Sequence, residues 1–257
     1  MMQSPRAISA PRTSAIRSVC ALALGLAWVA SPAPAQQLDR ASVTSRAQTA
    51  YLSEDAAGLG RLEASTRAWS RSKDPLELYT YAFVQFRIQQ LATKQKKEDA
   101  AEAAGKACIE ALDTALEGSA RFTEGHALQS ACYGYLANLG GLGAIRNGSR
   151  SGNSIEKALA QSPRNPRVIL VDAMGYYFRP SFAGGDEKKA CARFLEAVTA
   201  FDKDAGANGI RWGAPEAHYW VGRCKREEGD REAERQFFER ALQLAPNFAA
   251  AKRALGR

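Results

Sequence analysis

The residue types that could carry chemistry in this chain gather in a pattern, Glu-x-His-x5-Cys, that occurs twice. Its two copies are Glu124, His126 and Cys132, and Glu216, His218 and Cys224. A His and a Cys at one place could bind a metal ion or share a proton. On a helix, however, residues six apart differ by about 240° in direction, so the two side chains of each copy face different ways. The pattern therefore predicts a repeated structural unit, and we expect no metal site.

No other spacing in the sequence is typical of a catalytic site. The sequence has no Ser-His-Asp arrangement, no His-Glu-x-x-His and no phosphate-binding loop. Segment 140–143 is rich in glycine, but no strand is predicted before it and no Gly-Lys-Ser/Thr follows. We interpret it as a flexible insertion and expect His126 and His218 to pack inside the fold. The sequence thus predicts a protein that is not an enzyme and needs no cofactor.

The elements that position these residues are predicted to be helices. Hydrophobic residues make up 46% of the chain, and after Leu38 they recur every three or four residues, without the hairpin signals of strands. Pro75, Pro166 and Pro215 fall where a first helical turn tolerates a missing N–H, and Asp74 can cap the first of these helices. The sequence thus predicts an all-α chain with helices at about 38–52, 54–71, 75–93, 97–117, 121–138, 152–161, 165–178, 186–202, 214–228, 230–244 and 247–255.

The first 35 residues are typical of a secretory signal. Three Arg and no acidic residue precede an apolar run of about twelve residues, and an A-x-A cleavage site ends at Ala35. The run is shorter than the ~20 residues that a membrane span needs, and Cys20 lacks the small preceding residue of a lipidated Cys. We predict cleavage after Ala35 and a periplasmic or secreted chain with no transmembrane segment.

The charge of the chain argues against nucleic acid as a partner. The formal net charge of +8 falls to +5 once the three Arg of the predicted signal are removed. Acidic and basic residues are interspersed along the predicted helices, as in segment 94–99, and form no basic stripe for phosphates. We therefore predict no nucleic-acid binding.

Small, aromatic and Pro residues recur at fixed spacing in the C-terminal part of the chain. In segment 215–246 they are Gly222, Gly229, Asp230, Phe238, Ala241 and Pro246. This set resembles the tetratricopeptide repeat, a unit of two antiparallel helices, although Glu234 and Lys225 depart from its pattern. The preceding chain matches the same frame, with insertions, at His126, Ser130, Tyr133, Ala158, Pro163, Pro166, Ala173, Tyr176, Ala190, Phe194 and Ala197. Together with segments 180–185 and 211–213, these matches resemble exported bacterial tetratricopeptide proteins.

The resemblance implies a right-handed superhelix, an α-solenoid of about five antiparallel helix hairpins. Residues 120–257 would form three repeats and a C-terminal cap helix, and residues 36–119 would form degenerate or capping hairpins. In such repeats the first helices line a concave face that binds ligands. The binding residues implied for that face and the loops beside it are Arg167, Met174, Tyr177, Phe178, Arg179, Trp212, Tyr219, Arg223 and Arg226.

The chain also has insertions relative to the repeat, at 139–151, 179–186 and 204–213, and long loops on a rigid scaffold often carry binding groups. Aromatic and Arg side chains would suit an extended peptide or an acidic group. We therefore predict a scaffold that binds a protein or peptide partner. The alternative is a small-solute-binding accessory of an envelope transport system, with a pocket near Phe178, Arg179 and Trp212. A more distant resemblance to helical periplasmic components of tripartite transporters implies this alternative.

Four Cys remain after the predicted cleavage, an even number suited to an oxidising compartment, and they allow three pairings. Cys108 lies about nine residues before the end of its predicted helix, and Cys132 about eleven after the start of the next, so antiparallel helices would hold them at nearly the same height. Cys191 and Cys224 stand in a similar relation. We predict the disulfides Cys108–Cys132 and Cys191–Cys224, each joining the second helix of one unit to the first helix of the next.

Overall fold

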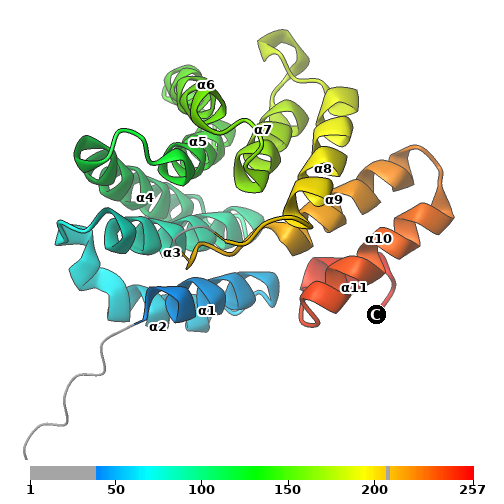
Figure 1. Cartoon of the computed structure of the whole chain (residues 1–257), viewed down its shortest axis with the longest axis horizontal. Helices are drawn as coiled ribbons and strands as arrows, with labels where there is room; N and C mark the ends of the chain where they lie inside the picture. Colours follow the sequence, from blue (N-terminus) through cyan, green and yellow to red (C-terminus); the bar gives the residue numbers. More distant parts are fainter. Residues whose placement is uncertain (1–38, 207–208) are drawn as a thin grey trace, which may run out of the picture. The chain divides into compact units, whose positions relative to one another are not determined.

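The residues that a computed structural model describes, 39–206 and 209–257, contain eleven α-helices and no strand (Figure 1). Consecutive helices pack as adjacent pairs, so the described part is an all-α solenoid. The helices are α1 (Arg40–Leu52), α2 (Ala56–Thr66), α3 (Pro75–Lys94), α4 (Glu98–Gly118), α5 (Thr123–Asn138), α6 (Ala144–Gln161), α7 (Pro166–Phe178), α8 (Glu187–Phe201), α9 (Ala214–Glu227), α10 (Arg231–Leu244) and α11 (Ala249–Ala254). Short 3-10 segments follow α2 and α7, at Arg67–Arg71 and Ser181–Ala183.

Two sequence predictions bear on the ends and the division of this chain. The predicted signal, 1–35, lies outside the described residues. Segment Leu38–Arg257 packs as one compact unit. The predicted boundary near residue 120 would therefore divide degenerate from regular repeats inside that unit, and it stays a prediction. Among the described helices, none is both long enough and apolar enough to cross a bilayer.

Side-chain caps explain where many of the helices begin. The carboxylate of Asp74 accepts a hydrogen bond from the backbone N–H of Leu76 at 2.8 Å, as predicted, and Pro75 occupies the first turn. The amide oxygen of Asn165 caps α7 in the same way, at 3.0 Å from the N of Arg167. The residues that cap helices in this manner are Asp39, Asp55, Asp74, Asn165, Asp186 and Asp230. Local sequence therefore sets these helix starts.

Packing inside a hairpin depends on small residues opposite large ones. Gly222 of α9 lies against the ring of Phe238 of α10, and a Cβ at residue 222 would stand 2.7 Å from that ring. No other residue type fits so close an approach. The small and aromatic residues on which the sequence resemblance depends thus hold α9 and α10 together.

The first insertion differs from the prediction. Segment 139–151 was expected to be an insertion before a helix at 152–161, but α6 already begins at Ala144, and only 139–143 connects it to α5. The first two turns of α6 are largely exposed, and the helix contacts α5 from Ser151 on, where its hydroxyl donates to the carbonyl of Ser130 at 2.9 Å.

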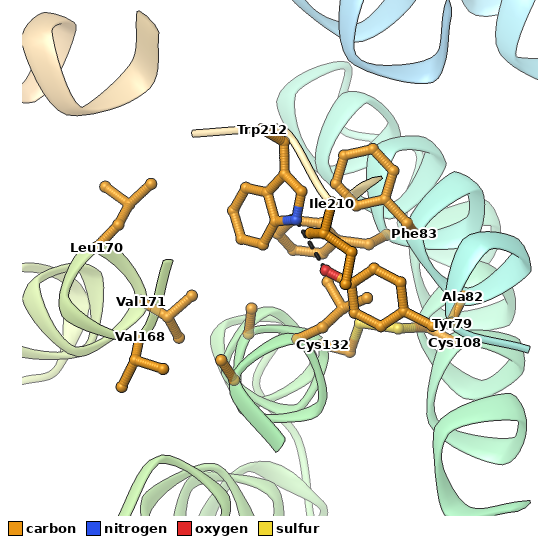
Figure 2. Packing of buried hydrophobic residues seen from close by; sticks show 14 of the residues in the cluster. Tyr79, Ala82, Phe83, Cys108, Cys132, Val168, Leu170, Val171, Ile210 and Trp212 are labelled. Carbon is orange, nitrogen blue, oxygen red and sulfur yellow. Dashed lines mark hydrogen bonds between the residues drawn. A yellow bond between two sulfur atoms is a disulfide. The ribbon is translucent and has the colours of Figure 1, made fainter. Parts of the chain in front are cut away.

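The third insertion, 204–213, forms part of the core. Ile210 and Trp212 are buried, and the indole of Trp212 lies 5.5 Å from the ring of Phe83 in α3 (Figure 2). The indole Nε1 donates a hydrogen bond to the hydroxyl of Tyr79 at 2.8 Å, so its polar atom is satisfied inside the core. The insertion therefore packs over α3.

A buried ion pair joins the first helices to the ninth. The guanidinium of Arg87 in α3 is 1% exposed and donates to the carboxylate of Glu216 in α9 at 2.7 Å. Gln48 of α1 accepts a hydrogen bond from Arg87 and donates one to Glu216 at 2.8 Å. The ring of Tyr51 lies 4.6 Å from the same guanidinium, and its burial raises the pKa of that phenol. Helix α1 thus covers facing parts of α3 and α9.

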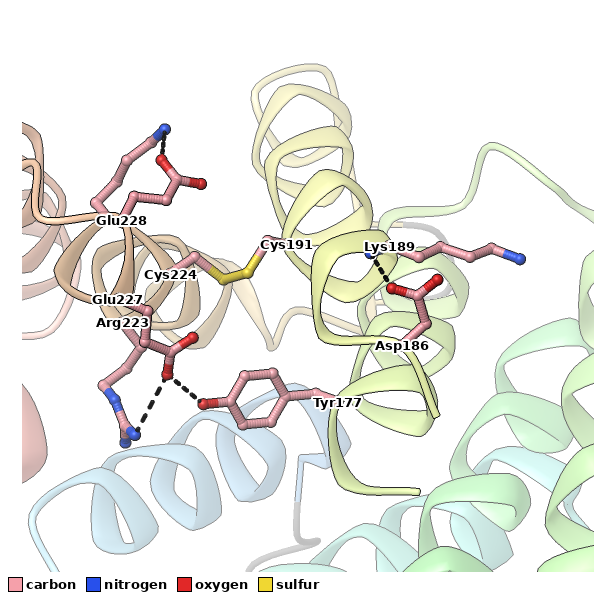
Figure 3. The surroundings of a disulfide bond; sticks show 9 residues. Tyr177, Asp186, Lys189, Cys191, Arg223, Cys224, Glu227 and Glu228 are labelled. Atoms are coloured by element: carbon pink, nitrogen blue, oxygen red, sulfur yellow. Dashed lines mark hydrogen bonds and ion pairs between the residues drawn. A yellow bond between two sulfur atoms is a disulfide. The ribbon is translucent and has the colours of Figure 1, made fainter. Parts of the chain in front are cut away.

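Both predicted disulfides are present. Cys108–Cys132 joins α4 to α5 with a Cα–Cα distance of 6.5 Å, and Cys191–Cys224 joins α8 to α9 at 5.8 Å (Figure 3). Each links the second helix of one hairpin to the first helix of the next. Neighbouring hairpins are therefore covalently tied at two of their junctions.

Candidate binding site

The nine predicted binding residues lie in separate places. Arg167 and Phe178 stand at opposite ends of α7, eleven residues apart, which is about 16 Å along the helix axis. Trp212 is buried near Arg167, whereas Arg179 follows Phe178 in the chain. The pocket predicted near Phe178, Arg179 and Trp212 is therefore not formed, because the rise of α7 separates its members.

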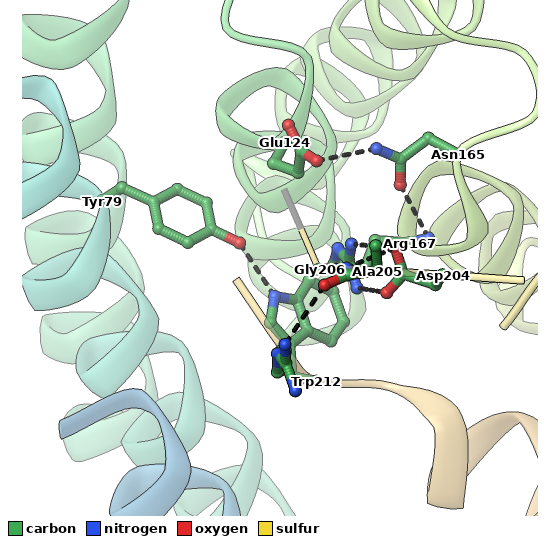
Figure 4. A network of polar contacts seen from close by, with 9 residues as sticks. Tyr79, Glu124, Asn165, Arg167, Asp204, Ala205, Gly206 and Trp212 are labelled. Carbon is green, nitrogen blue, oxygen red and sulfur yellow. Dashed lines mark hydrogen bonds and ion pairs between the residues drawn. The ribbon is translucent and has the colours of Figure 1, made fainter. Parts of the chain in front are cut away.

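Arg167 is engaged inside the protein. Its guanidinium is 1% exposed and pairs with the carboxylate of Asp204, with N–O distances of 2.8 and 3.1 Å (Figure 4). Burial opposes the charge of Asp204, but hydrogen bonds from Arg167 and from the N–H of Gly206 outweigh it and hold the pKa of this carboxyl below its usual value. The pair fastens the third insertion to α7.

Tyr219 and Arg226 hold the C-terminal helices. Arg226 donates to the carboxylate of Glu234 at 2.6 Å and to the carbonyl of Ala254 at 3.1 Å. The ring of Tyr219 lies 5.2 Å from that of Phe248, which belongs to a small separate core around α10 and α11. In this structure both side chains are occupied by internal contacts.

Three aromatic rings gather where the C-terminal end of α7 meets α9. Tyr177 and Phe178 lie 5.0 and 5.2 Å from the ring of Trp220, and 5.1 Å from one another. Trp220 is stacked on the buried ring of Phe194, 5.6 Å away and tilted by 12°. Phe178 is 42% exposed, so the cluster reaches the surface. Met174 of α7 packs against the core close by in sequence.

Two charged residues of α9, Arg223 and Glu227, border these rings. The guanidinium of Arg223 lies 5.8 Å from the ring of Trp220 and 3.9 Å from the carboxylate of Glu227. The hydroxyl of Tyr177 donates to Glu227 at 2.8 Å (Figure 3). Burial, reinforced by this hydrogen bond, raises the pKa of Tyr177 to about 12. We call the five residues Tyr177, Phe178, Trp220, Arg223 and Glu227 the aromatic patch.

The sequence predicted part of this patch. Tyr177, Phe178 and Arg223 were among the predicted residues, whereas Trp220 was not. The sequence feature that could have identified Trp220 is its position next to Tyr219, in a helix that was expected to face the ligand. Arg87 was missed entirely, because nothing local marks a residue whose partner, Glu216, stands 129 positions later.

The histidines of the repeated pattern are buried. A ring nitrogen of His126 contacts the carbonyl oxygen of Ala120 at 3.0 Å, and the ring of His218 packs 5.9 Å from that of Phe237. Burial and the nearby Arg240 lower the pKa of His218. In the described part of the chain, no group of three or more His, Cys, Asp or Glu side chains is placed to hold a metal ion.

Comparison with known proteins identifies the fold. The structure is similar to the HusA haemophore from Porphyromonas gingivalis, with a TM-score of 0.58 and 20% identity, over 75% of this chain and 96% of that one. It also matches TTC0263, a thermophilic TPR protein of Thermus thermophilus, with a TM-score of 0.48 and 17% identity, over 79% and 89% of the two chains. No family model and no curated protein matches the sequence. At these identities the likeness concerns the fold alone, and it agrees with the all-α arrangement of adjacent helix pairs.

Proposed function

We propose that this protein is a non-catalytic binding scaffold outside the cytoplasm that recognises an extended peptide segment of a partner protein at the aromatic patch. One observation carries the proposal. The first helices of the hairpins are covered over much of their length, as at Ala127 and Leu170, whereas Phe178, Trp220 and Arg223 stay accessible or half-buried together. Clustered aromatic and Arg side chains are the residue types that contribute most to protein interfaces.

The chemistry of the patch favours an aromatic or apolar side chain next to an acidic group. The rings of Phe178 and Trp220 offer an apolar contact, and Arg223 offers a cation beside them. Its distance of 3.9 Å from Glu227 is too long for a hydrogen bond, so donors of Arg223 are free to approach a partner's carboxylate more closely. Glu227 then competes with the partner's carboxylate for the guanidinium of Arg223.

The proposed location outside the cytoplasm is supported by the two disulfides. Disulfides persist in oxidising compartments and are rare in the cytosol. The predicted signal at 1–35 agrees with such a location. The absence of catalysis is part of the proposal, and it is supported by the burial of His126 and His218 in packing contacts.

Random peptide display on the disulfide-bonded chain tests the proposal. We expect selected peptides to combine an aromatic residue with Asp or Glu, and to lose binding to Phe178→Ala and Arg223→Glu variants in fluorescence anisotropy. Replacing Glu227 by Gln should strengthen binding several-fold, because the internal competitor is removed.

The matched control is Arg235→Glu, a charge reversal on the exposed face of α10, where Arg235 pairs only with neighbours on its own helix. This variant should bind the peptides as the parent protein does. Selected peptides that bind all four variants equally would refute the assignment of the patch.

The alternative function, a small-solute-binding accessory of an envelope transport system, is favoured by a separate observation. A cavity of about 620 Å³ lies beside Trp212, within the size range of small-molecule sites. The cavity uses different residues from the aromatic patch, so the two functions can be tested independently.

A further inference from the structure

The cavity beside Trp212 is open to solvent on one side and is lined by parts of the chain that are distant in sequence. Helix α1 forms one wall, and the third insertion with the start of α9 forms another. The turn between α10 and α11 contributes the rest. The residues lining it are Ser45, Gln48, Thr49, Leu52, Arg167, Phe201, Asp204, Arg211, Trp212, Ala214, Pro215, Leu244, Ala245, Pro246 and Asn247. Its volume of about 620 Å³ is far larger than packing defects in a folded core.

A positive group with spare donors stands at the mouth of the cavity. Arg211 is exposed, and within the described residues its side chain makes one hydrogen bond, from Nη2 to the carbonyl of Ala205 at 3.3 Å. Its remaining N–H groups are available to a ligand. A guanidinium prefers carboxylate or phosphate partners, which accept two parallel hydrogen bonds.

A second donor comes from Arg167. Both terminal nitrogens of this side chain bind Asp204, but Nε is buried and has no hydrogen-bond partner among the described residues. An unpartnered buried donor of a charged group is costly, and a small shift of this side chain, which lines the cavity, would let a ligand acceptor reach Nε and remove that cost. Asp204 neutralises one of the two Arg, so the lining keeps one positive charge.

The N-terminus of α9 adds to the positive potential. Ala214 and Pro215, its first residues, line the cavity, and no side chain caps this helix. Gly213 stands before them with φ of +106°, a conformation that turns the chain tightly into the helix. Pro215 has no N–H, so Ala214 supplies the backbone donor at this lining, and the helix dipole adds positive potential that favours an anion.

The rest of the lining combines the polar side chains of Ser45, Gln48, Thr49 and Asn247 with apolar ones. Trp212 and Phe201 present aromatic surfaces, and Leu52, Leu244 and Pro246 present aliphatic ones. The indole N–H of Trp212 is already bonded to Tyr79, so the indole can offer only its ring surface to a ligand (Figure 4). An anion with an apolar body fits this combination better than an inorganic ion does.

We propose that this cavity binds a small organic carboxylate, with its carboxylate group at Arg211, Arg167 Nε and the first turn of α9, and its apolar body against Trp212 and Leu244. The site is distinct from the aromatic patch and does not depend on peptide recognition there. It requires the third insertion, because Asp204, Arg211 and Trp212 all belong to segment 204–213. The insertion thereby acquires a role besides filling the core.

Titration with benzoate and hexanoate tests the ligand class. We expect saturable binding, seen by calorimetry and by a change in tryptophan fluorescence, for both carboxylates. Benzyl alcohol and hexanol have the same bodies without the charge, and they should bind at least about tenfold more weakly, since a charge-assisted hydrogen bond is lost. Inorganic phosphate should compete poorly because it leaves the apolar walls empty. Equal binding of acids and alcohols, or no binding of either, would overturn the proposal.

Four variants locate the site. Arg211→Gln removes the exposed cation and should raise the dissociation constant for benzoate about tenfold or more. Thr49→Trp adds a large side chain to the wall formed by α1 and should abolish binding by filling the cavity. Arg235→Gln, on the exposed face of α10 and outside both candidate sites, is the matched control and should bind benzoate as the parent does. Arg223→Gln tests whether benzoate binds at the aromatic patch instead.

Far-ultraviolet circular dichroism and thermal melts establish that each variant is folded. A folded Arg211→Gln or Thr49→Trp variant with unchanged benzoate affinity would refute the site. Loss of benzoate binding in Arg223→Gln alone would move it to the aromatic patch. Peptide binding that fails while benzoate binding holds would count against the proposed function and leave this inference standing.

Discussion

The two copies of Glu-x-His-x5-Cys begin α5 and α9 in the same way but make different long-range contacts. Glu124 accepts a hydrogen bond from the side chain of Asn165, the cap of α7, at 2.7 Å. Glu216 instead pairs with the buried Arg87 and with Gln48. Both carboxylates are buried. The difference shows that the pattern fixes a helix start and a buried acid, whereas the neighbouring helices decide what that acid binds.

The two helices also differ in exposure at corresponding positions after the His of each copy. Leu128 and Ala131 of α5 are buried, while the corresponding Trp220 and Arg223 of α9 belong to the aromatic patch. Neighbouring helices cover these positions of α5 fully, whereas the corresponding positions of α9 are covered only in part. The Cys of each copy serves the same purpose, a link to the preceding helix. Each copy thus forms a disulfide to the preceding helix, but only the copy in α9 contributes to a partly exposed surface.

The largest contrast is expected from removing the charge of each Glu. Glu216→Gln leaves the guanidinium of Arg87 buried without a counter-ion and should lower the free energy of unfolding by about 3 kcal/mol or more. Glu124→Gln keeps an acceptor for Asn165 and should cost less than about 1 kcal/mol. Urea denaturation of the two variants measures the difference. Equal losses would mean that Glu216 contributes no special link between α1, α3 and α9.

The next effect concerns the disulfides. Replacing both Cys of either pair by Ala should lower the free energy of unfolding by about 3 kcal/mol in the chain-entropy model, because the sequence separations of 24 and 33 are similar. Cys191 is only half-buried, whereas Cys108 and Cys132 are fully buried. A thiol reductant should therefore open Cys191–Cys224 first, since exchange requires access to a sulfur.

Alkylation of freed thiols during graded reduction, followed by peptide mass spectrometry, gives the order of opening. The Cys-to-Ala pairs measured in urea give the energies. Earlier opening of Cys108–Cys132 would contradict the order expected from burial.

A smaller effect is expected from His218. Burial lowers the pKa of this His, so the unfolded chain binds a proton more readily than the folded one. Its contribution to stability is complete above about pH 6.5 and is lost as the pH falls towards the folded pKa, by at most about 1.4 kcal/mol per pH unit. Urea denaturation at pH 7 and pH 5 measures this slope. A His218→Gln variant that keeps the full slope would assign it to other groups.

The smallest effect is expected from Tyr177→Phe. Removing the hydroxyl breaks the hydrogen bond to Glu227 at the edge of the aromatic patch, and because the pair is partly solvated the cost should be below about 1 kcal/mol. A spectroscopic titration should lose one phenol that ionises near pH 12. A loss of several kcal/mol would show that the patch is part of the core rather than a surface.

Much of the fold was predictable because its signals are local. Asp74 and Pro75 mark a helix start through a side-chain cap and a missing N–H, whatever lies around them. The disulfide pairing followed from helix boundaries and antiparallel packing, which bring Cys108 and Cys132 to similar heights. The predicted helix boundary was wrong at α6. Helix α6 begins at Ala144, in a Gly-containing segment where sequence spacing placed an insertion, and it packs on α5 from Ser151 on.

The candidate site was predicted only in part, for the same reason. Tyr177 and Arg223 were identified from repeat spacing, but that spacing gives no information about which first-helix faces the chain covers with its own residues. Trp212 was expected to lie in a pocket with Phe178 and Arg179, but it packs against Phe83 and Tyr79, and only its small accessible remainder lines the cavity beside α1. The energy gained by burying a Trp is large enough to draw an insertion inwards.

The sequence by itself determined the helices, their caps, the hairpin order and the two disulfides, because each depends on residues close together in the chain or on the regular rise of a helix. The tertiary structure alone decided that α1 pairs with α9 through Arg87 and Glu216, that segment 204–213 lines a cavity, and that Trp220 completes the aromatic patch. These features depend on side chains brought together from distant segments, and their contacts exist only once the helices have packed. The two Glu-x-His-x5-Cys copies thus share a sequence pattern, but their Glu side chains bind different partners, Asn165 for Glu124 and Arg87 for Glu216.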